Sequence, residues 1–215
     1  MSVILFQGDS ITDCARNKNE LYSLGVGYAN LVSAELGYEH PNEYQFINKG
    51  ISGNRIVDLY ARIKADIINL KPDFMSILIG VNDVWHEISF QNGVDEAKFE
   101  KIYTMLIEEI YEALPDIKLM ILEPYVLLGS ATADTAERPD KWQTFDVETK
   151  KRAKVAKRIA EKFNIPFVSL QDKLDEATKL TGNTTYWTAD GVHPTPFGHE
   201  LIARAWLDAY RKYTS

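Results

Sequence analysis

The sequence predicts an α/β protein with one doubly wound, largely parallel sheet that helices cover on both faces. Short apolar runs of strand length alternate with amphipathic helical segments along the whole chain. The run at residues 74–79 is apolar almost throughout, which is typical of a strand covered on both faces. No change in composition divides the 215 residues, so we expect a single domain over residues 1–215.

The strands and helices follow from local periodicity. Five runs have the length and composition of strands: 3–6, 44–48, 74–79, 118–122 and 167–170. Helical periodicity predicts helices at 28–36, 56–67, 99–114, 145–163, 172–180 and 201–210. Residues 17–27, 123–142 and 181–194 lack a period and should be loops. The second of these is long for a connection without structure, so we expect a lid or a subunit contact there, and the chain to form homo-oligomers.

Composition limits the classes of protein that fit this chain. The formal net charge is −7, with acidic and basic residues interspersed, which argues against nucleic acid or an anionic membrane as partner. Cys14 is the single cysteine, so no internal disulfide forms; packing is its simpler explanation, although it lies close to Ser10. No stretch is long enough to span a membrane, and the N-terminus lacks a basic region and a cleavage site. We therefore expect a cytoplasmic protein.

The pentapeptide Gly-Asp-Ser-Ile-Thr at residues 8–12 follows the first predicted strand. In open α/β sheets, ligands bind outside the carboxyl ends of the strands, where Ser10 is placed. Gly8 lets the backbone turn sharply, which would lift the Ser10 hydroxyl clear of the sheet. A helix cap is the alternative role of Ser10, because serine is preferred at that position.

Two further loops should emerge beside Ser10. Gly53 follows the second predicted strand and can offer an unobstructed backbone N–H, and Asn82 follows the third and can offer its side-chain amide. Acyl transfer needs a nucleophile, a base, a group that orients the base and donors for the oxyanion. Ser10 can supply the nucleophile, and Gly53 and Asn82 can supply donors for the oxyanion.

A histidine is needed as the base, and the chain has four. His193 lies three residues after Asp190, which lets the carboxylate turn back and accept a hydrogen bond from the imidazole. A turn with a capping carboxylate explains the same spacing. We interpret His40, His86 and His199 as surface or structural residues.

Four sequence blocks together resemble the SGNH hydrolases, also called the GDSL lipase/esterase family. They are residues 8–12, 50–54 (Gly-Ile-Ser-Gly-Asn), 80–83 (Gly-Val-Asn-Asp) and 190–194 (Asp-Gly-Val-His-Pro), and their order matches over essentially the whole chain. The resemblance implies a flavodoxin-like, three-layer α/β/α sandwich and no cofactor. It assigns Ser10 as nucleophile, His193 and Asp190 as the rest of a triad, and Ser10, Gly53 and Asn82 as the oxyanion hole.

A narrower resemblance is to the branch with intracellular acetylxylan esterases. It rests on Trp85 after the third block, on residues 186–187 (Tyr-Trp) before the fourth, and on residues 196–199 and 203–205 after it. It implies hydrolysis of short, acetyl esters on carbohydrates such as xylo-oligosaccharides, and it includes oligomers. A thioesterase or lysophospholipase, or a carbohydrate-binding protein without turnover, are the alternatives.

Loop aromatic residues suit sugar rings and a small acyl pocket, although they also fit core edges or an interface. We expect substrate contacts from Asp9, Trp85, Tyr125 and Trp187. Asp9, Asp13 and Asp83 raise the hypothesis of a metal site, but no histidine or cysteine joins them at ligand spacing. We therefore expect hydrogen bonding within the loops and no metal.

Overall fold

A computed structural model describes residues 1–214. Within this range, five strands form one sheet: β1 (Ser2–Gly8), β2 (Tyr44–Asn48), β3 (Phe74–Leu78), β4 (Lys118–Leu122) and β5 (Phe167–Val168). Their order is β2-β1-β3-β4-β5, and every neighbouring pair is parallel. The predicted parallel sheet is therefore confirmed, and its order is that of flavodoxin-like folds.

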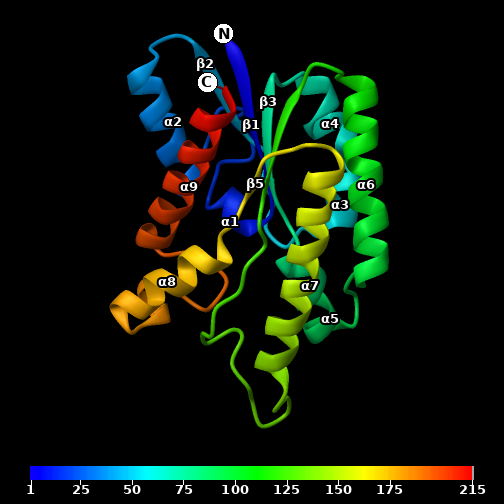
Figure 1. Ribbon diagram of the computed structural model, residues 1–215, viewed down its shortest axis with the longest axis vertical. Helices are drawn as coiled ribbons and strands as arrows, with labels where there is room; N and C mark the ends of the chain where they lie inside the picture. The colour runs from blue at the N-terminus through cyan, green and yellow to red at the C-terminus, as the bar shows by residue number, and fades with distance from the viewer. Residues whose placement is uncertain (215) are drawn as a thin grey trace.

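Helices cover both faces of the sheet, which confirms the three-layer prediction (Figure 1). One layer holds α2 (Tyr28–Glu39), α8 (Gln171–Thr181) and α9 (Pro196–Thr214). The other holds α3 (Ile56–Ala61), α4 (Ile63–Asp66), α6 (Glu96–Ala113) and α7 (Lys141–Lys162). Two helices begin just past the carboxyl ends of strands: α1 (Ser10–Asp13) follows β1 and α5 (Val81–Phe90) follows β3.

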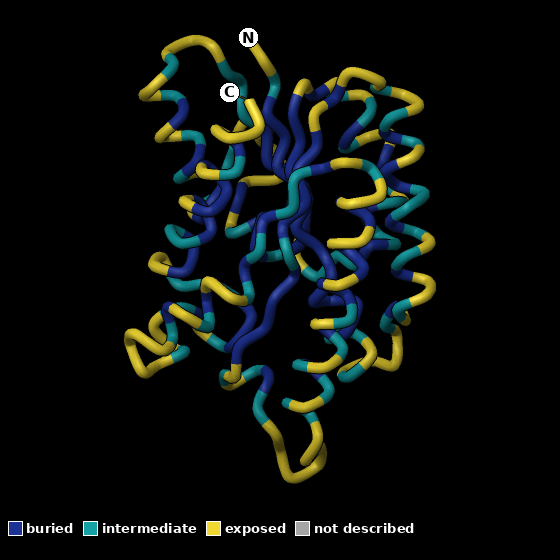
Figure 2. Tube along the Cα trace, viewed as in Figure 1, coloured by how far each residue is buried: buried dark blue, intermediate teal, exposed yellow. Residues whose placement is uncertain are grey.

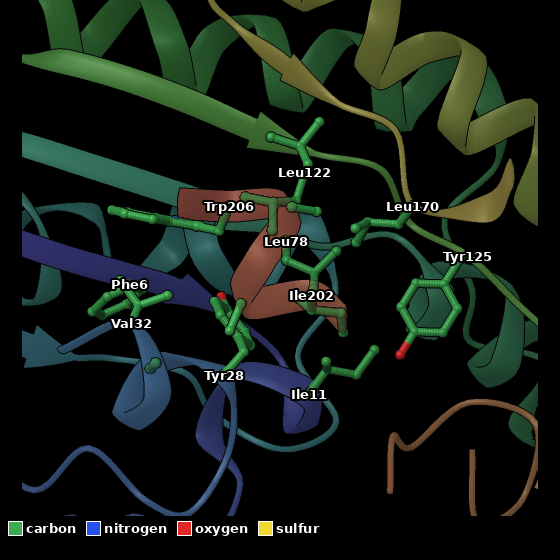
Figure 3. Close-up of a cluster of buried hydrophobic side chains, with 14 of the residues drawn as sticks. Phe6, Ile11, Tyr28, Val32, Leu78, Leu122, Tyr125, Leu170, Ile202 and Trp206 are labelled. Carbon is green, nitrogen blue, oxygen red and sulfur yellow. The ribbon is translucent and has the colours of Figure 1, made fainter. Parts of the chain in front are cut away.

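Alternation along the strands divides the buried side chains into two cores. In β1, Ile4 and Phe6 face the layer of α2 and α9, whereas Leu5 faces the layer of α3 and α6. The first core is rich in aromatic rings, with Trp206 of α9 packed against Phe6 at a centroid distance of 5.6 Å (Figure 3). The buried stretches of the chain in Figure 2 follow the strands and the inner faces of these helices. The sheet is thus held rigidly from both sides.

The order of the strands creates a crevice at one edge of the sheet. The chain passes from β1 to β2 on one side and then returns past β1 to β3 on the other. In the register, Phe6 lies opposite Asn48 and Gly8 lies opposite Leu78, so the three strands end close to the same level. The loops that follow β1 and β3 leave this reversal point in different directions, which is where such sheets bind ligands.

Several helices differ from the sequence prediction. Helix α5 was not predicted, although Val81, Val84 and Ile88 have helical spacing, because residues 80–83 were interpreted as loop. The predicted helix at 56–67 is broken at Arg62 into α3 and α4, and a short 3₁₀ turn, Ile68–Leu70, follows. Helices α7 and α9 begin four and five residues earlier than predicted, at Lys141 and Pro196.

The structure assigns the helix cap near Ser10 to another residue and gives a second reason for glycine at position 8. Ser10 is the first residue of α1, and Asp9 is its N-cap, with Asp9 Oδ1 accepting the Ile11 N–H at 3.0 Å. A β-carbon on Gly8 would lie 2.4 Å from the carbonyl oxygen of Leu78. Glycine is therefore required there by the close approach of β1 to its surroundings.

Candidate active site

The loops after three adjacent strands meet in one pocket. Ser10 follows β1, Gly53 lies in the loop after β2, and Asn82 is in the first turn of α5 after β3. His193 reaches the same place from the loop before α9. The pocket has a volume of about 350 Å³, and its lining residues are Ser10, Ser52, Gly53, Asn82, Trp85, His86, Phe90 and His193.

Ser10, His193 and Asp190 form a continuous chain of hydrogen bonds. Ser10 Oγ lies 2.9 Å from His193 Nε2, and His193 Nδ1 lies 2.7 Å from Asp190 Oδ2. Asp190 Oδ1 accepts the backbone N–H groups of Val192 and His193 at 2.9 and 2.8 Å. Because a carboxylate only accepts, the imidazole proton is on Nδ1 and the lone pair on Nε2 faces the serine hydroxyl. This is the arrangement that a general base for a serine nucleophile requires.

The same contacts set the charges of the pair. The hydrogen bond to Asp190 raises the pKa of His193 above its ordinary value, and burial only partly opposes this shift. Burial disfavours the ionised form of Asp190, but hydrogen bonds from the side chain and backbone of His193 outweigh it and lower the pKa of Asp190 to about 2. Asp190 is therefore an anion beside a histidine that is readily protonated.

Three candidate N–H donors, from Ser10, Gly53 and Asn82, belong to residues that line the pocket of the Ser10 hydroxyl. Ser10 begins α1, so its backbone N–H lies at the positive end of that helix and has no acceptor within it. Gly53 has a φ of +81°, a left-handed conformation that glycine adopts without strain. Asn82 Nδ2 donates one hydrogen to the carbonyl of Asn54 at 3.1 Å, which leaves its second hydrogen free to point elsewhere. Such a set of donors can stabilise an oxyanion.

Arg62 ties together the loops that carry these donors. Its Nε donates to Asn54 Oδ1 at 2.8 Å, Nη1 donates to the carbonyl of Lys49 at 2.8 Å, and Nη2 to that of Gly8 at 3.3 Å. One planar guanidinium group thereby links the end of β1 with the loop after β2. Local sequence patterns contain no signal for such a clamp.

Asp13 and Ser52 make a second connection between the loops after β1 and β2. Asp13 Oδ2 accepts hydrogen bonds from the backbone N–H and the hydroxyl of Ser52 at 3.0 and 2.9 Å. Asp83 accepts the backbone N–H of Ile56, with its two oxygens at 3.1 and 3.3 Å. In residues 1–214, no three or more His, Cys, Asp or Glu side chains are grouped so that they could hold a metal ion.

The structure places the four expected substrate contacts in different environments. Trp85 lines the pocket, and its ring centroid lies 5.8 Å from that of His193. Tyr125 is fully buried and donates its hydroxyl to the carbonyl of Val192 at 3.0 Å. Asp9 is also buried, and burial raises its pKa to about 7 although the Ile11 N–H and His193 favour the anion. Because both side chains are buried, they do not contact a ligand in the pocket. Asp9 and Tyr125 instead hold the loops of the site through their hydrogen bonds to Ile11 and Val192.

Trp187 lies in another part of the molecule. It lines a groove between α8 and α9 with Tyr186 and Phe197, and none of the catalytic candidates lines that groove. Its indole N–H donates to Thr181 Oγ1 at 3.1 Å. Of the expected substrate contacts, Trp85 alone faces the pocket of Ser10.

The other histidines and Cys14 also have defined surroundings. His199 Nδ1 accepts the backbone N–H of Tyr28 at 3.1 Å, so Nε2 carries the proton and donates it to Cys14 Sγ at 3.2 Å. Burial lowers the pKa of His199 to about 4, which keeps this imidazole neutral. Cys14 therefore accepts a hydrogen bond as a packed thiol. His86 differs from its interpretation as a surface or structural residue, because it lines the pocket.

The long segment after β4 packs against the loop of Asp190. Leu127 N–H donates to the carbonyl of Gly191 at 2.8 Å, and Ala131 N–H donates to that of Asp190 at 2.9 Å. The part at 124–127 is buried, whereas 134–140 is exposed. A lid movement would have to break these bonds, so the inner part of the segment braces Asp190. The subunit contact stays a prediction.

The doubly wound fold and this pocket, with a serine, a histidine and an aspartate joined by hydrogen bonds, define a hydrolase built on a three-layer α/β/α fold. The model of the GDSL-like lipase/acylhydrolase family matches residues 6–201 of the chain. The chain is 35% identical over 212 residues to an acetylxylan esterase of Geobacillus stearothermophilus. The aligned region covers 95% of this chain and 91% of that esterase. The chain belongs to the GDSL-like lipase/acylhydrolase family and is a carboxylic ester hydrolase.

Solved structures agree with this assignment. A putative GDSL-like lipase from Parabacteroides merdae ATCC 43184 superposes with a TM-score of 0.88 at 34% identity, over 97% of this chain and 94% of that one. Axe2, an acetylxylan esterase from G. stearothermophilus, superposes with a TM-score of 0.82 at 33% identity, over 97% of this chain and 93% of that one. A carbohydrate-binding protein without turnover is therefore not retained as an alternative. No helix in the described part of the chain has the length and apolar character needed to cross a bilayer.

Proposed function

We propose that this protein is a serine esterase that removes short acyl groups, above all acetyl, from carbohydrates such as xylo-oligosaccharides. Ser10 is its nucleophile, His193 its general base and Asp190 the group that orients the base. The observation that carries the proposal is the hydrogen-bond chain from Ser10 Oγ through both nitrogens of His193 to Asp190. Two structures of Axe2 with one serine or one aspartate replaced are described as catalytic mutants, which supports these residue types.

The geometry leads to a two-step reaction. Ser10 Oγ attacks the ester carbonyl while His193 Nε2 takes its proton, and the negative charge that develops on the carbonyl oxygen faces the N–H groups of Ser10, Gly53 and Asn82. His193 then gives the proton to the departing alcohol, and an acyl-Ser10 ester remains. Water attacks this ester with His193 again as the base, which releases the acid and restores the serine.

The pocket supports a short acyl group. Its volume of about 350 Å³ has to hold both the acyl group and part of the alcohol, and its apolar walls are Trp85 and Phe90. The acetylxylan esterase relative supports the acetyl group and the sugar. A short acyl group leaves room in this pocket for part of the alcohol.

Acetate release from acetylated xylo-oligosaccharides tests the proposal directly. We expect the wild type to release acetate, and Ser10→Ala to lose this activity and labelling by a fluorophosphonate. With 4-nitrophenyl esters, we expect a higher kcat/KM for acetate than for octanoate. Preference for octanoate would overturn the short-chain assignment, and activity of Ser10→Ala would overturn the nucleophile.

A further inference from the structure

His86 lines the same pocket as the triad but has no part in the mechanism above. Helix α5 presents Asn82, Trp85, His86 and Phe90 to the pocket, at spacings of three, four and eight residues from Asn82. His86 Nε2 lies 3.9 Å from the position that a β-carbon would take on Gly53. The imidazole therefore lies next to the Gly53 donor of the oxyanion hole.

The ring of His86 is held in place without a polar partner. It packs edge-on against Phe90, with a centroid distance of 5.5 Å and an interplanar angle of 90°. Among the described residues, neither of its ring nitrogens takes part in a hydrogen bond with the protein. By contrast, both nitrogens of His193 are engaged, by Ser10 and by Asp190. His86 thus brings an unused donor and an unused acceptor to the pocket.

The surroundings of His86 keep its imidazole neutral. Burial is the main cause of its lowered pKa, the positive charge of Arg55 adds to the shift, and Asp58 opposes it. A neutral imidazole has one N–H donor and one lone pair. A hydroxyl group, which also both donates and accepts, is the matching ligand.

We propose that His86 determines specificity by hydrogen bonding to a hydroxyl group that neighbours the ester in the alcohol part of the substrate. This inference rests on the proposed function and extends it. The carbonyl oxygen of the ester occupies the donors of Ser10, Gly53 and Asn82, and the ester oxygen faces His193. An acetyl group offers only a methyl group beyond these atoms. A polar partner for His86 must therefore belong to the alcohol, as the neighbouring hydroxyl of a sugar does.

A pair of small esters isolates this contact. Ethyl acetate and 2-hydroxyethyl acetate carry the same acyl group and differ by one hydroxyl next to the ester. The readout is the ratio of their kcat/KM values, because damage to folding or to the triad lowers both rates together. Comparing each variant with the wild type also cancels the difference in intrinsic reactivity between the two esters.

His86→Phe keeps the size of the ring and removes its polar atoms. We expect the preference for 2-hydroxyethyl acetate to fall about fivefold in this variant, which is the usual effect of one neutral hydrogen bond. His86→Gln, which keeps a donor and an acceptor, should recover part of the preference. His40→Phe makes the same change at a half-buried histidine near β2, outside the pocket, and should keep the wild-type ratio.

The results separate this inference from the proposed function. An unchanged ratio in His86→Phe, or an equal loss in His40→Phe, would overturn the role of His86 while leaving the triad in place. Failure of the wild type to release acetate from xylo-oligosaccharides would overturn the natural substrate, but the two small esters would still report on His86. If the wild type hydrolysed neither small ester, both the role of His86 and the proposed esterase function would be overturned.

Discussion

The two histidines nearest Ser10 and Cys14 show how strongly the local hydrogen bonds decide what a residue does. His193 donates a hydrogen bond from Nδ1–H to Asp190, which raises the pKa of His193 and leaves Nε2 ready to accept a proton. His199 accepts a backbone N–H at Nδ1, and burial lowers its pKa to about 4. The same side chain is thus a base in one place and a neutral packing residue in the other.

The pH dependence of activity should follow His193. Only the neutral imidazole can accept the Ser10 proton, so kcat/KM should rise with pH, with a midpoint above the ordinary histidine value of 6.5. Asp190→Asn removes the main cause of the raised pKa, so the midpoint should move to lower pH, and kcat should fall about 10⁴-fold. Profiles with 4-nitrophenyl acetate between pH 5 and 9 measure both effects. An unmoved midpoint in Asp190→Asn would contradict the pairing.

Removing the Asn82 amide should reduce turnover without unfolding the protein. Asn82→Ala deletes one of the three proposed oxyanion donors, and the loss of one such donor typically lowers kcat by about 10²–10³. KM should change much less, because the donor acts on charge that develops in the transition state. Asn30→Ala, at an exposed position of α2, is the matched control. Turnover like that of the wild type in Asn82→Ala would remove this residue from the mechanism.

Helices and loops determine the direction in which the side chains of the site point. Helix α5 turns Asn82, Trp85 and His86 toward one pocket, and α1 places Ser10 at its N-terminus. Arg62 lies at the break between α3 and α4, where its guanidinium group reaches the carbonyls of Gly8 and Lys49. Arg62 therefore helps to fix the position of the proposed nucleophile relative to the loop that carries Gly53.

Arg62→Met should lower the rate of catalysis and leave substrate binding almost unchanged. Without Arg62, the loops of Ser10 and Gly53 lose one of the connections between them, and small displacements of reacting groups lower rates by about 10- to 100-fold. We expect this loss in kcat, with little change in KM, in steady-state kinetics on 4-nitrophenyl acetate. Arg62→Lys can replace part of the contacts and should recover part of the rate.

A control for Arg62 is available on the surface. Arg211→Met removes an exposed guanidinium that pairs with Glu35 and Glu39 and should leave the kinetics unchanged. Circular dichroism checks that Arg62→Met is folded. A folded Arg62→Met with the kcat of the wild type would show that the loops do not need this anchor.

At the scale of the whole molecule, the site rests on a rigid sheet whose buried acidic groups lower its stability. Two apolar cores hold the sheet from both faces, and Asp9 and Asp83 are buried at its carboxyl edge. Burial raises the pKa of both groups, and the charge of Asp9 adds to the shift of Asp83. Ionising these carboxyls in the folded state therefore opposes folding.

The stability of the protein should reflect Asp9 as the pH rises. Its pKa is about 7 in the folded state, against 3.8 ordinarily, so the folded chain keeps a proton that the unfolded chain has lost. The contribution of the Asp9 proton to the free energy of unfolding is fully present below about pH 4 and is lost as the pH rises to about 7. Asp9→Asn should thus melt near the wild-type temperature at pH 4 and above it at pH 8.

Thermal melts at both pH values check this prediction. Asp208→Asn removes one exposed negative charge from α9 and should show no such dependence on pH. A difference in melting temperature between Asp9→Asn and the wild type that is the same at both pH values would show that Asp9 does not titrate between the folded and unfolded states in this range.

The sequence by itself determined the parallel sheet, because strand-length apolar runs and amphipathic helices alternate along the chain. It also placed Ser10, Gly53 and Asn82 at one edge, because the carboxyl ends of parallel strands lie together, whereas His193 was selected as the base through its spacing from Asp190 and the family resemblance. Periodicity extended past Gly80 would have predicted α5, and with it the direction of His86.

Only the tertiary structure decided which side chains meet. It buried Tyr125 beneath Val192, placed Trp187 in a groove apart from Ser10, and joined Gly8, Lys49 and Asn54 through Arg62. Periodicity reports which face of a helix or strand is apolar, but it carries no information on the direction of a loop residue. Contacts between residues distant in the sequence depend on how the strands are ordered and the layers packed, and these are properties of the whole chain.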